Sequence, residues 1–93
     1  MSFSILLSEE AEEDIYIAYQ WYEDQRVGPG DEFTASLNSS FSSILSVPEN
    51  YGFKKNSTRG CILSGFPYII LFLVKGTNIL IISVFHTSRG PIL

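Results

Sequence analysis

The chain has 93 residues, of which 45% are hydrophobic and 14% aromatic, and it carries a formal net charge of −4 at pH 7. This length suffices for one hydrophobic core, so we expect a single domain over residues 1–93. No apolar run approaches the roughly 20 residues of a transmembrane helix, and the N-terminal segment MSFSILLSEE lacks the basic region of a signal peptide. We therefore expect a soluble, cytoplasmic protein.

The single cysteine and the single histidine narrow the kinds of site that are available. Cys61 cannot form an internal disulfide, and free cysteine is among the most buried residue types, so we expect it in the core. One histidine and one cysteine, with every acidic residue in the other half of the chain, make a poor ligand set. We expect no metal site and no cofactor.

Charge is unevenly distributed along the sequence. All ten acidic residues lie between Glu9 and Glu49, opposed there only by Arg26, which gives the first 49 residues a formal charge of −9. Residues 50–93 contain five basic residues and no acid. Complementing a helix N-terminus explains the cluster from Glu9 to Asp14, but it does not explain the missing acids later. Such asymmetry often marks surfaces that bind different partners.

Two helices are predicted in the first half of the chain. A short strand at residues 3–7 leads to Ser8, a good N-cap. The first helix then carries a buried stripe, and Val27-Gly28-Pro29-Gly30 breaks it, so that the second helix folds back and stops before Pro48. The expected buried positions are Ala11, Ile15, Ala18, Tyr19 and Tyr22 in the first helix and Phe33, Leu37, Phe41, Ile44 and Leu45 in the second.

The second half of the chain follows the period of strands. Residues 51–55, 58–63, 68–75 and 78–86 are strand candidates, and a turn with Gly76 joins the last two. That hairpin is apolar on both faces, so it should lie inside the sheet, and the first strand should pair back with the late strands. We expect an α+β domain of order β-α-α-β-β-β, with a helical hairpin packed on one face of an antiparallel sheet.

Motifs at the helix junction and near the C-terminus carry a family resemblance. With WYEDQRVGPGDEF and FPYIILF…ISVFHTSRGP in this order, nearly the whole chain resembles the RelE/ParE toxin superfamily. Members are toxins of bacterial type II toxin–antitoxin operons, often labelled plasmid stabilisation proteins. The matching positions are Trp21, Tyr22, Glu23, Gly30, Phe33, Phe66, Pro67, Tyr68, His86, Arg89 and Pro91. The resemblance implies the RelE/ParE-like fold and a cognate antitoxin as partner.

The superfamily contains two kinds of action. RelE-like members cut mRNA in the ribosomal A site, whereas ParE-like members bind DNA gyrase and are not regarded as enzymes. An endoribonuclease needs a proton acceptor and donor, for which His86 is suited, and cations on the phosphate, for which Arg89 and Arg59 are suited. Lys54 and Lys55 would add positive field, and Tyr68 or Tyr51 could stack on a base.

Each of these residues also has a purely structural interpretation. His86 could cap a strand end, the basic residues could form a solvated edge, and Tyr68 is more simply a core residue. The sequence pI of about 4.7, and a second helix without a basic residue, count against nucleic-acid binding, which depends on phosphate contacts.

The low pI favours a ParE-like toxin that inhibits gyrase by protein binding. Its contacts to the target or to the antitoxin would be Lys54, Lys55, Arg59, Tyr68 and Arg89, and the basic ones would suit an acidic antitoxin tail. The alternatives are a RelE-like mRNA endoribonuclease and a non-toxic relative that only binds an antitoxin. A homodimer or a heterotetramer with the antitoxin are the candidate assemblies.

Overall fold

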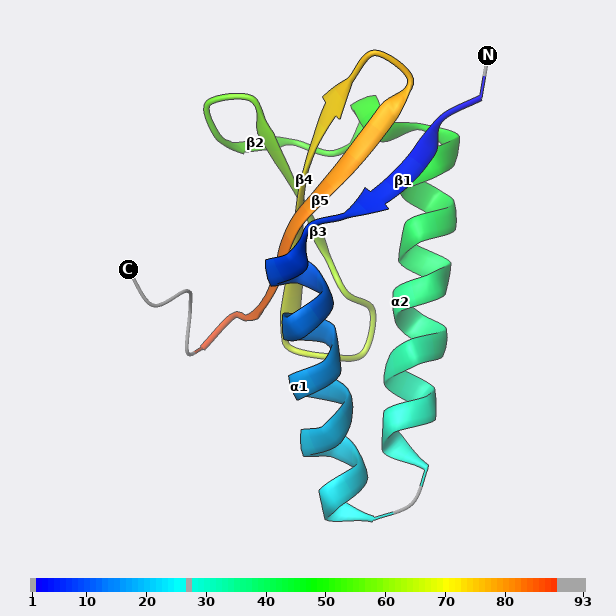
Figure 1. The fold of residues 1–93 in the computed structure, drawn as a ribbon, viewed down its shortest axis with the longest axis vertical. Helices are drawn as coiled ribbons and strands as arrows, with labels where there is room; N and C mark the ends of the chain where they lie inside the picture. Colours follow the sequence, from blue (N-terminus) through cyan, green and yellow to red (C-terminus); the bar gives the residue numbers. More distant parts are fainter. Residues whose placement is uncertain (1, 27, 89–93) are drawn as a thin grey trace.

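In the computed structural model, residues 2–26 and 28–88 are described (Figure 1). Two helices lie side by side on one face of a five-stranded sheet. The elements are β1 (Ser4–Leu7), α1 (Glu9–Gln25), α2 (Pro29–Ser46), a short 3-10 helix (Pro48–Asn50), β2 (Phe53–Lys55), β3 (Thr58–Ile62), β4 (Tyr68–Lys75) and β5 (Asn78–His86).

The sheet has the strand order β1-β5-β4-β3-β2. The expected α+β class is confirmed, with four strands after the helices because both shorter strand candidates form. The hairpin of β4 and β5 occupies the interior, and β1 pairs with β5, as expected. That pairing is parallel, whereas the other three are antiparallel. Parallel neighbours need a long connection, and here both helices and strands β2 to β4 lie between β1 and β5 in the chain.

Local capping sets the helix boundaries. The Ala11 backbone N–H donates to Ser8 Oγ at 3.0 Å, so Ser8 is the N-cap of α1, as predicted. The predicted break between the helices is shorter than Val27–Gly30, since α2 already begins at Pro29, a position where proline is favourable. Gly28 has φ +122°, a conformation that other residues rarely adopt. Helix α2 ends at Ser46, before Pro48, as predicted.

The core lies between the helices and the sheet. It is filled by the inner stripes of both helices and the helix-facing side chains of β3, β4 and β5, with an aromatic cluster where α1 meets α2. Tyr22 stacks on Phe33 with ring centroids 5.5 Å apart, and Phe66 packs edge-on against both rings. The buried apolar residues are Ala11, Ala18, Phe33, Leu37, Ile44, Cys61, Leu63, Tyr68, Ile69, Ile70, Phe72, Ile79, Ile81 and Val84.

Burial confirms two specific expectations, since Cys61 and the ring of Tyr68 both belong to this core. Neither helix combines the length and apolar character of a membrane-spanning segment in the part of the chain that is described.

Candidate functional site

The predicted site residues are distributed over the strand half of the molecule. His86 ends β5, Tyr68 begins β4, Arg59 lies in β3, and Lys54 and Lys55 lie in β2. Arg89, named both for catalysis and for binding, lies outside the described residues.

His86 is part of a packed strand end. Its ring contacts the ring of Tyr68 edge-on, with centroids 5.2 Å apart, and these two residues are register partners on β5 and β4. The backbone N–H of Ser88 donates to His86 Nδ1 at 3.1 Å. This is the strand-end role that the sequence left open. Tyr68 is only 4% exposed, so its side chain offers almost no surface to a partner in this structure.

Arg59 is held by its own neighbourhood. Its Nη1 donates to the carbonyl oxygen of Tyr51 at 2.6 Å and to that of Glu49 at 3.4 Å. The guanidinium carbon lies 4.0 Å from the centroid of the Phe53 ring, a cation–π contact. The arginine therefore ties the segment after α2 to the sheet and is only partly available to a ligand.

The structure does not bring Arg59 and His86 together. Arg59 pairs with Phe72 and His86 pairs with Tyr68, four residues apart on β4, and two strand spacings separate β3 from β5. From standard strand dimensions this places their backbones roughly 16 Å apart. The Arg59 side chain is also directed to the backbone carbonyls of Tyr51 and Glu49, whereas His86 packs on Tyr68, so the two side chains do not meet in this structure. Their catalytic roles stay predictions.

The two lysines, by contrast, are both exposed, and Lys54 lies beside an apolar surface. The stem of Lys54 crosses Gly60, because a Cβ added there would lie 2.7 Å from Lys54 Cγ and 3.1 Å from Ile69 Cδ1. The missing side chain at Gly60 thus lets the apolar stem of Lys54 lie across β3 beside Ile69.

That apolar surface is the sheet face opposite the helices, which we call the outer sheet face. Register partners share a face, and Ile62–Ile69–Phe85 and Leu6–Leu80–Leu73 are two such rows. Ile62 is 69% exposed and Leu6 is 51% exposed, and both helices lie on the other side of the sheet (Figure 1). The outer sheet face comprises the exposed residues Leu6 and Ile62, the half-buried residues Leu71, Leu73, Leu80 and Phe85, and Ile69, which is buried although it lies on this side of the sheet and not in the core.

Two carboxylates have structural roles that the sequence analysis did not assign. Asp14 Oδ2 accepts the backbone N–H of Val84 at 3.0 Å. Burial raises the pKa of Asp14 above its usual 3.8, the Val84 hydrogen bond opposes the increase, and Glu13 adds to it. The available signal was helical spacing, since Asp14 follows Ala11 by three and precedes Ala18 by four, on the inner face of α1.

Glu23 caps the second helix. Its Oε2 accepts the backbone N–H groups of Gly30 at 2.8 Å and Gly28 at 3.3 Å, at the N-terminus of α2. Glu23 and Gly30, two of the positions that carry the family resemblance, are therefore in direct contact.

Cys61 is not placed for nucleophilic chemistry. Burial raises the pKa of its thiol, with hydrogen bonds to Tyr51 and Ser40 opposing the increase, so the thiolate is disfavoured. Burial likewise raises the pKa of Tyr51, and the neighbouring Cys61 adds to that increase. Among residues 2–26 and 28–88, no cluster of three His, Cys, Asp or Glu side chains is arranged to hold a metal ion.

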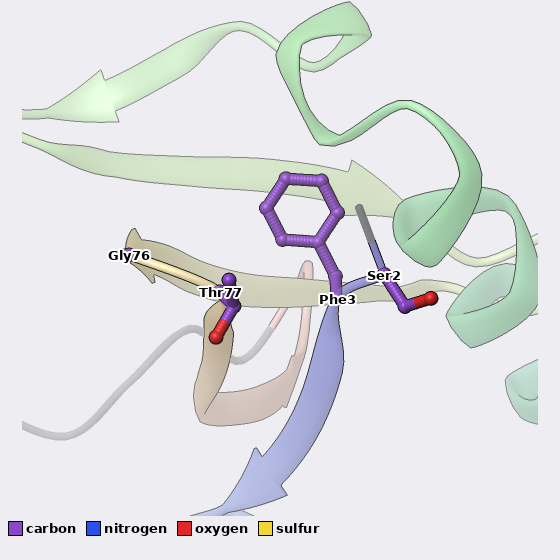
Figure 2. Close-up of a pocket in the computed structure, with 4 residues that line it drawn as sticks. All are labelled: Ser2, Phe3, Gly76 and Thr77. Carbon is purple, nitrogen blue, oxygen red and sulfur yellow. The ribbon is translucent and has the colours of Figure 1, made fainter.

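A pocket of about 250 Å³ lies at the opposite end of β5 from His86. Figure 2 shows its described lining, with Ser2 and Phe3 from the start of the chain beside Gly76 and Thr77 from the β4–β5 turn. A phenyl ring, two hydroxyls and a glycine supply neither a charge nor a general acid or base, so we assign the pocket no chemistry.

Comparison with known proteins agrees with this geometry. Curated sequences give no significant match. A solved structure titled "Chromosomal ParDE TA system from P. aeruginosa" superposes with a TM-score of 0.76 at 19% identity, over 90% of this chain and 95% of that one, and so shares the fold. Residues 5–91 match the family described as ParE toxin of type II toxin–antitoxin system, parDE. The resemblance to the RelE/ParE superfamily is thus confirmed, and the chain belongs to the ParE toxin family of type II toxin–antitoxin systems.

Proposed function

We propose that this chain is the toxin of a toxin–antitoxin pair and inhibits DNA gyrase in the cytoplasm by binding it, without chemistry of its own. The observation that carries the proposal is the outer sheet face, an apolar surface on which Leu6 and Ile62 are exposed and beside which Lys54 lies. An apolar surface of this kind suits a protein partner, because exposed contiguous apolar patches mark protein interaction sites.

Electrostatics supports a protein target over RNA. Proteins that bind a nucleic-acid backbone use many phosphate contacts from Lys and Arg. The chain has six basic and ten acidic residues. The guanidinium of Arg59 already donates hydrogen bonds to backbone carbonyls. His86 and Arg59 also make their contacts with different neighbours, Tyr68 and the segment after α2, and are not directed toward one another. The family match points the same way, since ParE-like toxins act on gyrase.

The cognate antitoxin would bind the outer sheet face through an apolar segment. Acidic residues on that segment would pair with Lys54 and Lys55, because residues 50–93 contain no acid of their own. An antitoxin that binds the folded toxin but not the unfolded chain raises the free energy of unfolding of the toxin. The increase is about 2.7 kcal/mol when the free antitoxin is at about 100 times its Kd.

A supercoiling assay with purified gyrase tests the target. The toxin, synthesised cell-free, should lower the rate of DNA supercoiling and trap gyrase on cleaved DNA, and the product of the adjacent gene should reverse both effects. In cells, induction should reduce thymidine incorporation before methionine incorporation. An earlier fall in methionine incorporation, with cleaved mRNA, would instead identify a ribosome-dependent nuclease.

The His86→Gln substitution separates these two actions. Glutamine cannot serve as a general acid or base, so the variant should lose nuclease activity but keep gyrase inhibition. Because His86 packs on Tyr68, the thermal midpoint of the variant must be measured alongside. A folded variant without toxicity would contradict the binding mechanism, and a wild-type chain without any effect on growth would identify a non-toxic relative.

A further inference from the structure

The β2 edge of the sheet carries an exposed aromatic ring with an arginine stacked on it. Phe53 and Arg59 are register partners on β2 and β3, and Arg59 is paired in turn with Phe72 on β4. Register partners share a face, so these three side chains form a row on the helix-facing side of the sheet. Phe72 is 0% exposed, whereas Phe53, at the outer end of the row, is 59% exposed. The row therefore leads from the core to an edge strand that lies away from both helices (Figure 1).

The guanidinium of Arg59 is held in place but keeps donors. Nη1 is bonded to the carbonyl oxygens of Tyr51 and Glu49, and the guanidinium carbon lies 4.0 Å from the centroid of the Phe53 ring. Among residues 2–26 and 28–88, Arg59 makes no further hydrogen bond and no ion pair. Nε and Nη2 are thus left with two parallel N–H groups, the arrangement that binds a carboxylate through both of its oxygens. Because the guanidinium is already fixed, a ligand would not have to order it.

The surrounding charges favour a carboxylate ligand from a protein. Residues 50–93 contain no acid. Glu49, the nearest acid in sequence, gives Arg59 its backbone carbonyl. One arginine beside one ring suits a single carboxylate, whereas a nucleic-acid backbone is bound through many phosphate contacts. The exposed Phe53 ring offers an apolar contact next to the charge, and aromatic residues and arginine are enriched at protein interfaces. The ligand that fits is an acidic side chain with an apolar neighbour.

We infer that Phe53 and Arg59 bind an acidic residue of the antitoxin, with its carboxylate on Nε and Nη2 of Arg59 and an adjacent apolar side chain on the Phe53 ring. Lys54 lies on the other side of the sheet, since its stem runs beside Ile69 of the outer sheet face. Strand β2 therefore presents a cation on each side of the edge. An antitoxin segment on the outer sheet face must pass around β2 to reach Arg59, so the interface covers both sides of this edge. The inference rests on the proposed function in naming the antitoxin as the partner.

Calorimetric titration of the toxin with the product of the adjacent gene tests the contact. Arg59→Gln and Phe53→Ser should each weaken binding about tenfold or more. Arg59→Lys should stay weak because lysine lacks the planar fork, whereas Phe53→Tyr keeps the ring and should bind like the wild type. The matched controls lie on α1 and at its end. Tyr16→Ser removes a similarly exposed ring (64%), Arg26→Gln removes the same charge as Arg59→Gln, and neither should change the affinity. If Arg59→Gln lowers the thermal midpoint, the two variants of the exposed Phe53 decide.

A double-mutant cycle identifies the carboxylate. Each acidic residue of the antitoxin is replaced by its amide, and one replacement should weaken binding to the wild type but have little effect on binding to Arg59→Gln. The same replacement should show no coupling to Arg26→Gln. If no acid couples to Arg59, or if the Phe53→Ser toxin binds like the wild type, the inference is wrong while an antitoxin that still binds leaves the proposed function standing. A product that does not bind the wild-type toxin overturns both. Binding of a labelled single-stranded oligonucleotide that is lost in Arg59→Gln would make the pair a nucleic-acid contact and also overturn the inference.

Discussion

At the scale of single residues, the acidic side chains of α1 divide into those that hold the fold and those that face solvent. Strand β1 ends at Leu7, and beyond that point no strand among residues 2–26 and 28–88 pairs with that edge of β5. The start of α1 substitutes for one. The Ser8 backbone N–H donates to Ile81 O at 3.0 Å, Ser8 Oγ donates to Ile82 O at 2.8 Å, and Asp14 accepts from Val84 N.

Removing the Asp14 carboxylate should therefore destabilise the protein. Asp14→Ala leaves the Val84 N–H without its acceptor, and we expect a loss of about 1–3 kcal/mol in the free energy of unfolding. Asp14→Asn keeps an acceptor oxygen and should cost less. Glu13→Ala, at an exposed neighbouring position, is the control and should change stability by less than about 0.5 kcal/mol. Urea denaturation measures all three, and equal losses for Asp14→Ala and Glu13→Ala would contradict the assigned role.

The pH dependence of stability should also report Asp14. Its pKa is raised in the folded state, chiefly by burial, so the folded protein holds this proton more tightly than the unfolded chain. The group therefore adds stability below its unfolded pKa, and this stability is lost as pH rises through the folded pKa. Relative to Asp14→Asn, the wild type should gain stability as the pH falls from neutral toward 3.8. If the difference in the free energy of unfolding between the wild type and Asp14→Asn stays constant, or moves in favour of the variant as the pH falls, Asp14 does not have a raised pKa in the folded state.

At the scale of elements, the α1–α2 junction depends on one side chain from the first helix. Glu23 caps α2, and the space for its carboxylate exists because residue 30 is glycine. A Cβ at Gly30 would lie 2.5 Å from both Glu23 Cγ and Glu23 Oε2. Tyr19 lies near the same carboxylates: the charge of Glu23, burial and Asp31 all raise the pKa of Tyr19. Sequence patterns place a turn here but do not reveal the cap.

Gly30→Ala should destabilise the protein, although alanine is favoured over glycine inside helices by about 1 kcal/mol. The new methyl group displaces the Glu23 carboxylate, and loss of a helix cap costs about 1 kcal/mol. The effect should nearly vanish when Glu23 is already alanine, because nothing is left to displace, and a double-mutant cycle in thermal or urea unfolding measures this coupling. If the stability losses of Gly30→Ala and Glu23→Ala simply add in the double variant, the Gly30 methyl group does not act by displacing the Glu23 carboxylate.

At the scale of the whole molecule, the sheet separates two apolar sides. One side is covered by the helices, and the other, the outer sheet face, is not covered by either of them. Electrical polarity accompanies this division, with the acids on the helices and most of the cations on the strands. A partner that covers the outer sheet face would bury apolar area and neutralise Lys54 and Lys55 together.

Ile62→Lys tests that arrangement. The side chain is largely exposed, so the substitution should not unfold the toxin, but it places a strongly hydrated charge within the proposed antitoxin contact. We expect antitoxin affinity to fall about tenfold or more, equivalent to about 1.4 kcal/mol, by calorimetric titration. Val47→Lys makes the same kind of change at an exposed position after α2 and should leave the affinity unchanged. Equal affinity for both variants would place the antitoxin elsewhere.

The sequence by itself determined the elements and their class. Apolar spacing and local caps act over a few residues, so the helical hairpin, the end of α2 before Pro48, and the apolar hairpin of β4 and β5 were all predictable. The short motifs were enough to indicate the toxin family. The burial of Cys61 and Tyr68 was predictable from residue type and from the strand pattern.

Only the tertiary structure decided what depends on residues far apart in the chain. Asp14 and Val84 are separated by 70 positions, and nothing local marks their hydrogen bond. The parallel pairing of β1, the packing of His86 on Tyr68, and the separation of His86 from Arg59 follow from strand order and register. Sequence names which side chains could act, but the distances between them are set by the long-range pairing of the sheet.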